Sequence, residues 1–147
     1  MTERVLLVVA HPVIATGIET LLRLEGDYEV RRASSIAEIA SVGDWVPTVA
    51  FIDGTLLAGQ AQVTIGVPAY VLSGSERDGH QLAAKLDDGR GWLRKDATGP
   101  ELAHAIARVT NGPAPGEGLG KMTLALVLVS CVIVLALVAY LVSLAFY

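Results

Sequence analysis

Three polar side chains with complementary chemistry stand at or near the ends of short apolar runs in this sequence. Asp53 closes the run VAFID, Ser73 lies in VLSGS (71–75), and Lys95 lies in GWLRKD (91–96). In an open parallel sheet the carboxyl ends of the strands meet at one edge, where α/β folds place their sites. We therefore expect the carboxylate, the hydroxyl and the ammonium to lie together, with Asp53 as the natural centre of any chemistry and an Asp53–Lys95 ion pair as the structural alternative.

The elements that must position these residues alternate regularly along the chain. Apolar, β-branched runs predict five strands, at 5–9, 28–33, 49–53, 67–73 and 91–95. Helical spacing of apolar residues predicts helices near 13–25, from 35, at 76–86 and at 98–109. Two of these starts have capping-box spacing, Ser35 with Glu38 and Thr98 with Glu101. Only residues 54–66 separate the third and fourth strands, so we expect a short helix or an irregular crossover there. The pattern predicts a doubly wound α/β domain.

Composition and charge limit the classes of function. The 147 residues include 11 basic and 15 acidic side chains, a net charge of −4 with no basic patch, which argues against nucleic acid as a direct partner. Cys131 is the single cysteine, so neither an intrachain disulfide nor a Cys/His metal set is available. The N-terminal residues lack the pattern of a secretory signal peptide. We expect no metal and no cofactor.

The C-terminal part of the sequence has a different composition from the rest. We predict a domain at 1–112, a Gly/Pro-rich linker at 113–120 and a transmembrane helix at 121–147, because residues 122–147 carry no charge and about 20 apolar residues cross a bilayer. Lys121 favours the cytoplasmic side. The predicted location is a single pass of the plasma membrane with the N-terminal domain in the cytoplasm.

Small and β-branched residues form one seam along the predicted transmembrane helix. Their spacing alternates between four and three, and the members are Ala125, Val129, Val132, Ala136, Ala139 and Ser143. Small residues let helices approach closely in lipid, so the seam favours contact with an integral membrane protein or a second copy of this chain. The alternative is a plain anchor that faces membrane lipid on all sides.

With these residues laid out, the first 112 positions resemble a response-regulator receiver domain. The resemblance is carried by VLLVVAHPVIATGIETLL, VAFID, VLSGS and RGWLRKDATGPELAHAI, and it covers about three quarters of the chain. It implies a flavodoxin-like fold with a five-stranded parallel sheet of order 2-1-3-4-5, here with a shortened third helix. It also implies bacterial two-component signalling as the origin of the fold.

The resemblance assigns roles to individual positions. Asp53 stands at the phosphoacceptor position, Ser73 and Lys95 at the phosphate-sensing positions, and Trp92 at the aromatic switch position. The acidic pair that such domains carry after the first strand is replaced by Val9 and Ala10. For Ser73 the structural alternative is a strand-end hydroxyl bonded to the backbone, and Trp92 either packs inward or faces a partner.

Losing the acidic pair has a physical consequence. A phosphoryl group carries about two negative charges, and a Mg²⁺ ion held by several oxygen ligands normally offsets its repulsion from the carboxylates. Val9 and Ala10 supply no ligand, so the sequence favours a structural role for Asp53 over phosphoacceptor chemistry.

The sequence therefore predicts a non-enzymatic pseudo-receiver that acts as a membrane-anchored accessory or regulatory subunit of a bacterial complex. It resembles orphan response-regulator-like accessory subunits of the proton-pumping NADH dehydrogenase, respiratory complex I. Two alternatives stay open: a membrane-tethered receiver phosphorylated at Asp53, and a module that binds a small ligand beside Val9 and Ala10.

Overall fold

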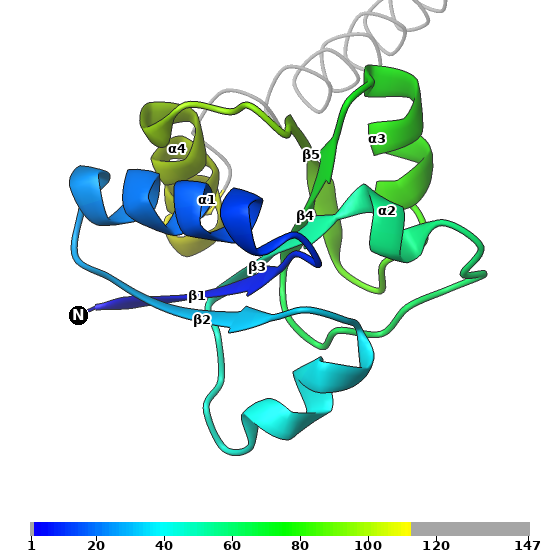
Figure 1. The fold of residues 1–147 in the computed structure, drawn as a ribbon, viewed down its shortest axis with the longest axis horizontal. Coiled ribbons are helices and arrows are strands. Elements are labelled where there is room, and N and C mark those ends of the chain that lie inside the picture. The colour runs from blue at the N-terminus through cyan, green and yellow to red at the C-terminus, as the bar shows by residue number, and fades with distance from the viewer. Residues whose placement is uncertain (1, 113–147) are drawn as a thin grey trace, which may run out of the picture. The chain divides into compact units, whose positions relative to one another are not determined.

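A five-stranded parallel sheet forms the centre of the domain, in the order β2-β1-β3-β4-β5 (Figure 1). The computed structural model describes residues 2–112. Its elements in chain order are β1 (Glu3–Val8), α1 (Pro12–Glu25), β2 (Tyr28–Ala33), the 3-10 helix η1 (Ala37–Val42), β3 (Val49–Asp53), α2 (Gly54–Leu57), β4 (Ala69–Ser73), α3 (Glu76–Ala83), β5 (Gly89–Arg94) and α4 (Gly99–Thr110). The predicted α/β class and strand order are confirmed.

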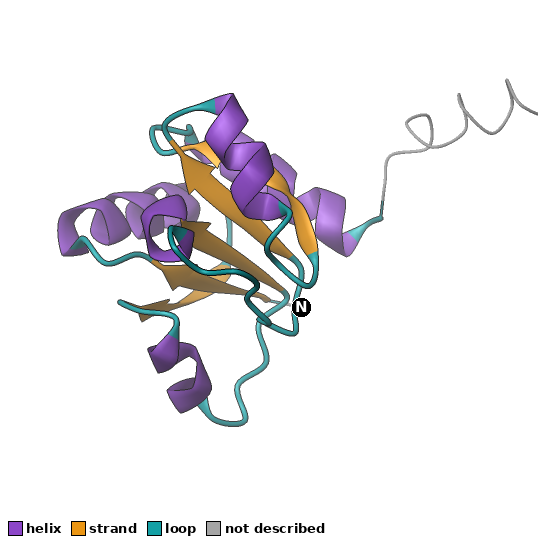
Figure 2. Cartoon of the chain, turned by 90° about the vertical axis from the view of Figure 1, so that its right-hand side faces the viewer, coloured by secondary structure: helices purple, strands orange, loops and turns teal. Residues whose placement is uncertain are grey.

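The central strands form because continuous apolar runs are buried on both faces of the sheet. β3 and β4 are buried at every position, as parallel strands covered by helices must be (Figure 2). One face packs against α1 and α4 around Leu22, Phe51 and Ile106. The other face packs against η1, α2 and α3 around Ile52, Leu57 and Val71. The ends of β3, β4 and β5 are thereby held rigidly at one edge.

The two predicted capping signals have different outcomes. At the start of α4 the Glu101 carboxylate accepts hydrogen bonds from the backbone N–H and the hydroxyl of Thr98, as predicted. At Ser35 the hydroxyl does accept from the N–H of Glu38, but the Glu38 carboxylate turns back to Ser34 instead. The short helix that follows is a 3-10 helix of six residues, none of them buried.

The crossover after β3 is short, as predicted, and it is held by bonds that the sequence did not suggest. α2 has four residues, and the segment after it pairs with the chain after α3 through a bridge between Val63 and Leu86. The Asp87 carboxylate accepts from the N–H groups of Ile65 and Gly66, at 2.8 and 3.0 Å. The crossover is therefore an ordered segment held by a β-bridge and hydrogen bonds, and it contains no long helix.

Strand and helix boundaries differ from the predicted ones by a few residues. β4 begins at Ala69 rather than at position 67, α3 ends at Ala83 rather than at 86, and β5 spans Gly89–Arg94 rather than 91–95. Such shifts are ordinary where pairing and turns decide the ends of elements. The apolar runs located the elements correctly, and the turns set their limits.

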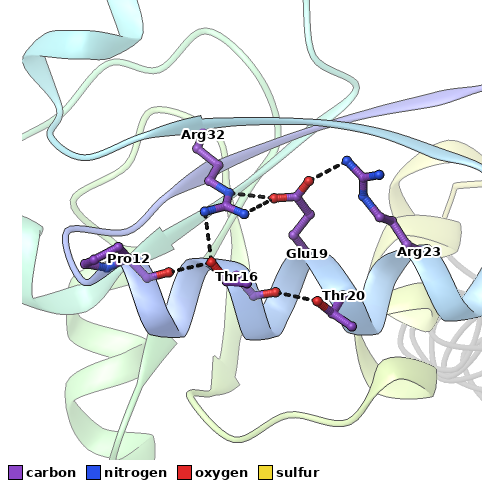
Figure 3. A network of polar contacts seen from close by, with 6 residues as sticks. All are labelled: Pro12, Thr16, Glu19, Thr20, Arg23 and Arg32. Carbon is purple, nitrogen blue, oxygen red and sulfur yellow. Dashed lines mark hydrogen bonds and ion pairs between the residues drawn. The ribbon is translucent and has the colours of Figure 1, made fainter.

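A polar network joins α1 to β2 (Figure 3). The Glu19 carboxylate binds the guanidinium groups of Arg23 and Arg32, and Arg32 also donates to the Thr16 hydroxyl. Burial alone raises the pKa of Glu19, but the two arginines outweigh it and hold this pKa below its ordinary value. The network fastens the edge strand β2 onto the helix.

We expect Glu19→Gln to lower the free energy of unfolding by about 1 kcal/mol at pH 7. Because the folded pKa of Glu19 is depressed, its contribution is present above the unfolded pKa and is lost as the pH falls through the folded value. Chemical denaturation of wild type and variant between pH 7 and pH 3 should show the difference closing. Asp27→Asn, an exposed acid between the same two elements, should change stability by less than about 0.5 kcal/mol at either pH.

The predicted linker at 113–120 and the predicted transmembrane helix at 121–147, with its seam, lie outside the described residues. Within residues 2–112, no helix is both long enough and apolar enough to span a bilayer.

Candidate functional site

Asp53 and Lys95 form an ion pair at the edge of the sheet where β3 and β5 end. Lys95 Nζ lies 2.9 Å from Asp53 Oδ1, and the N–H of Thr55 donates to the same oxygen at 3.1 Å. The Asp53 side chain is 7% exposed and that of Lys95 is 34% exposed. Asp53 is also the N-cap of α2, so one carboxylate oxygen serves both the ion pair and the start of that helix.

The local charges keep Asp53 ionised. Burial on its own raises the pKa of this carboxyl group. The hydrogen bond and charge of Lys95, together with the Thr55 N–H, outweigh that effect and hold the pKa of Asp53 below its ordinary value. At neutral pH the site therefore contains a carboxylate whose charge is already compensated within the protein.

Ser73 lies beside this pair and its hydroxyl is engaged with the backbone. Its Oγ donates to the carbonyl of Ser75 at 3.0 Å and accepts from the N–H of the same residue at 3.3 Å. The N–H of Lys95 in turn donates to the carbonyl of Ser73 at 3.2 Å. Ser73 therefore closes the turn after β4, which is the structural alternative that the sequence left open.

Val9 and Ala10 occupy the edge of the sheet next to Asp53. β1 and β3 pair in parallel up to Val8 and Ile52, so Val9 follows directly beside Asp53. Val9 is buried among the apolar residues packed under α1 and α4, and Ala10 is exposed. A carboxylate at position 9 would have to be placed in an apolar environment, whereas position 10 is open to solvent.

The residues at this edge do not fit a magnesium ion. Mg²⁺ requires octahedral oxygen coordination, usually through one or two carboxylates with water and substrate oxygens. Here Asp53 is the single carboxylate among the positions assigned by resemblance, and its Oδ1 is already bonded to Lys95 and Thr55. Among residues 2–112, no three His, Cys, Asp or Glu side chains are grouped closely enough to hold a metal ion.

Trp92 packs on α3, partly buried on β5. A Cβ placed on Gly79 would lie 2.5 Å from Trp92 Cγ, so the indole rests directly on the backbone of α3 and position 79 must be glycine for it to do so. The imidazole of His80 meets the indole edge-on, with ring centroids 6.2 Å apart. The Trp92 side chain, which stands at the switch position, therefore packs inward against α3.

A cavity of about 350 Å³ opens next to the ion pair, between α2 and α3. Its lining residues are Gly54, Thr55, Ala58, Leu72, Ser73, Gly74, Asp78, Gln81, Leu82 and Lys95. The sequence did not single out Asp78, Gln81 and Leu82, although their spacing of three and one along α3 puts them on one helical face. The cavity combines apolar residues with the Lys95 ammonium group, the Asp78 carboxylate and the polar side chains of Thr55, Ser73 and Gln81.

No protein-family model matches this sequence, and no curated protein matches it. Solved structures do match. A response-regulator receiver domain from Clostridium thermocellum is 26% identical, with 74% of this chain and 94% of that chain covered and a TM-score of 0.58. A CheY-like receiver from Methanospirillum hungatei is 19% identical, with 76% and 96% covered and a TM-score of 0.57.

A third neighbour is the receiver domain of a sensor histidine kinase from Pseudomonas aeruginosa, solved with a magnesium ion in its active-site cleft. It is 22% identical, with 76% of this chain and 100% of that chain covered and a TM-score of 0.57. All three neighbours have nearly their whole length covered in the comparison with this chain. The described domain has the fold of a CheY-like response-regulator receiver.

Proposed function

We propose that this chain is a receiver-fold binding module without phosphotransfer activity, anchored to the cytoplasmic face of a bacterial membrane as an accessory subunit. The observation that carries the proposal is the state of Asp53. Its carboxylate is paired with Lys95 at 2.9 Å, and the adjoining positions are Val9 and Ala10. The Pseudomonas aeruginosa neighbour was solved with magnesium in its cleft, whereas within residues 2–112 of this chain no three His, Cys, Asp or Glu side chains are grouped to hold a metal ion.

The charge balance supports binding rather than phosphorylation. A phosphoryl group on Asp53 would bring about two negative charges to a site where Lys95 is the single cation among the described residues that line the cavity. Phosphorylation of Asp53 would also break the bond between Lys95 and Asp53 Oδ1, and Lys95 would then have to bind the phosphoryl oxygens instead. The ion pair holds the ends of β3 and β5 together.

The proposed anchor rests on the sequence of residues 122–147, which contains no charged side chain and is long enough to span a bilayer. The domain surface and the anchor would then be two linked contacts with one partner complex. Linkage raises the effective concentration of the second contact once the first is made. The partner we propose first is a respiratory complex such as the proton-pumping NADH dehydrogenase, which rests on the resemblance noted above.

Two measurements test the anchor and the partner. We expect the full-length protein to fractionate with membranes and a chain ending at residue 120 to be found in the cytosol. Purification in a mild detergent should recover the full-length protein with subunits of an integral membrane complex, identified by mass spectrometry. A truncated chain that stays with the membranes contradicts the anchor, and a full-length protein recovered without other subunits contradicts the accessory role.

The rival function is a membrane-tethered receiver that is phosphorylated at Asp53 and signals through Ser73 and Trp92. Its support is the geometry of the edge, because Asp53 pairs with Lys95, and Lys95 and Ser73 both line the cavity beside that pair. It requires a stoichiometric mass gain on incubation with a small phosphodonor and Mg²⁺. Our proposal requires that no such gain occurs.

A further inference from the structure

Asn111 and Gly112 follow directly after the last turn of α4, where the compact domain ends. Asn111 is the single asparagine of the chain, and it is exposed. Helix α4 ends at Thr110, and so does the first of the two compact units of the chain. The Asn111 amide therefore stands in solvent at the junction between the domain and the segment that follows it.

The backbone requires a glycine after Asn111. Gly112 has a φ of 75°, in the left-handed region that glycine adopts readily and that commonly ends helices. A Cβ built on Gly112 would meet no atom within 4 Å, so nothing crowds this peptide unit. Within residues 2–112, no hydrogen bond holds the Asn111 side-chain amide. The amide and the next peptide nitrogen are thus neighbours in an open, uncrowded turn.

Three aspartates of the domain are also followed by glycine, and each of their carboxylates is held by a partner. The partners are Lys95 and Thr55 for Asp53, Ser75 for Asp78, and Arg90 for Asp88. A carboxylate is a poorer target for a nitrogen nucleophile than a neutral amide, because its negative charge repels the attacking electron pair. Asn111 therefore differs from these three positions both in its chemistry and in its freedom to move.

We propose that Asn111 is a site of spontaneous covalent modification, where the asparagine is converted to aspartate and isoaspartate. The Gly112 nitrogen loses its proton to solvent and attacks Cγ of Asn111. The new C–N bond expels Nδ2, which leaves with a solvent proton as ammonia, and a five-membered succinimide results. The step is fast for an uncatalysed reaction because the two groups are adjacent in one chain.

Hydrolysis of the ring gives two products. Water adds to one of the two ring carbonyls and breaks the bond from that carbon to the Gly112 nitrogen. Opening at Cγ gives aspartate, and opening at the main-chain carbonyl gives isoaspartate. The sum of both steps is an amide plus water going to an acid plus ammonia, with no oxidant or reductant.

The products change both charge and connectivity at the end of α4. Either one adds a negative charge to a chain whose net charge is −4, and isoaspartate adds one carbon to the main chain between α4 and the segment after it. A carboxylate at this place lies near the negative end of the helix dipole and weakens the last turn. The reaction does not depend on Asp53 or on the proposed anchor, so its failure leaves the proposed function intact.

The test is peptide mapping by mass spectrometry of the full-length protein in a mild detergent, sampled over days at mildly alkaline pH. We expect position 111 to gain the mass that separates an acid from an amide, with isoaspartate among the products. The rate should lie within about tenfold of that of a synthetic peptide of residues 107–116. A slower rate would show that the folded chain protects Asn111, and aspartate without isoaspartate would exclude the succinimide. Either result would overturn the proposal.

Asn111→Gln is the matched control, because its longer side chain keeps the amide but must close a six-membered ring. We expect it to lose ammonia at least about tenfold more slowly than the wild type. The other side-chain amides of the chain, Gln60, Gln62 and Gln81, should stay unchanged in both proteins. Equal rates in wild type and Asn111→Gln would place the reaction elsewhere and overturn the assignment.

Discussion

Replacing Lys95 with methionine is expected to lower the free energy of unfolding by about 2 kcal/mol at pH 7. The Asp53 side chain is 7% exposed, so the substitution leaves a buried carboxylate without its cation. Removing one partner of a fully buried pair costs about 3–5 kcal/mol. Lys95 is 34% exposed and solvent screens the pair, so we expect the smaller figure.

The loss should depend on pH in a defined direction. In the wild type the pKa of Asp53 is depressed, so its contribution to stability is present above the unfolded pKa and is lost as the pH falls through the folded value. In Lys95→Met the effect of burial is no longer offset by the ammonium group, and the pKa of Asp53 rises. The two proteins should therefore differ most at neutral pH and converge once the carboxyl group is protonated.

Denaturant unfolding of residues 1–112 from pH 7 to pH 3 measures this difference. Lys85→Met is the matched control, because Lys85 donates to the carbonyl of Leu57 and no carboxylate is its partner in the described structure. It should cost less than about 1 kcal/mol and show no such convergence. Adding Asp53→Asn to Lys95→Met should recover part of the stability by removing the buried charge. A Lys95→Met protein as stable as the wild type at all pH values would contradict a structural ion pair.

The sequence was sufficient for the parts of the fold that depend on burial and on local capping. Continuous apolar runs identified β3 and β4 because both faces of these strands are covered, and Thr98 with Glu101 identified the start of α4 because the bonds involved are local. The hydrogen bonds that hold the crossover after β3 were not predicted. They depend on Asp87, whose bonding partners lie about twenty residues away in the chain.

The candidate site was likewise predicted only in part. Asp53, Ser73 and Lys95 were located because strand ends meet at one edge of a parallel sheet, and the structure does bring them together. Which bond each one makes could not be read from the sequence. Tertiary packing sets both the turn that engages the Ser73 hydroxyl and the contact of the Trp92 indole with the backbone at Gly79.

The same limit applies to surfaces. α1 was predicted from apolar residues at helical spacing that included Val13, yet Val13 is 72% exposed and Leu24 is 77% exposed. An amphipathic helix of a monomer normally places polar residues on its outer side. The departure of Val13 and Leu24 from that pattern is visible in the sequence only after the inner side of the helix has been identified.

We propose that Asp53 is a structural residue and not a phosphoacceptor. The most direct measurement is the intact mass of the protein after incubation with a small phosphodonor and Mg²⁺, with a conventional receiver domain treated in parallel. We expect the conventional receiver to gain one phosphoryl group while this protein, like its Asp53→Asn variant, gains none. A stoichiometric gain in the wild type that Asp53→Asn abolishes would contradict the account.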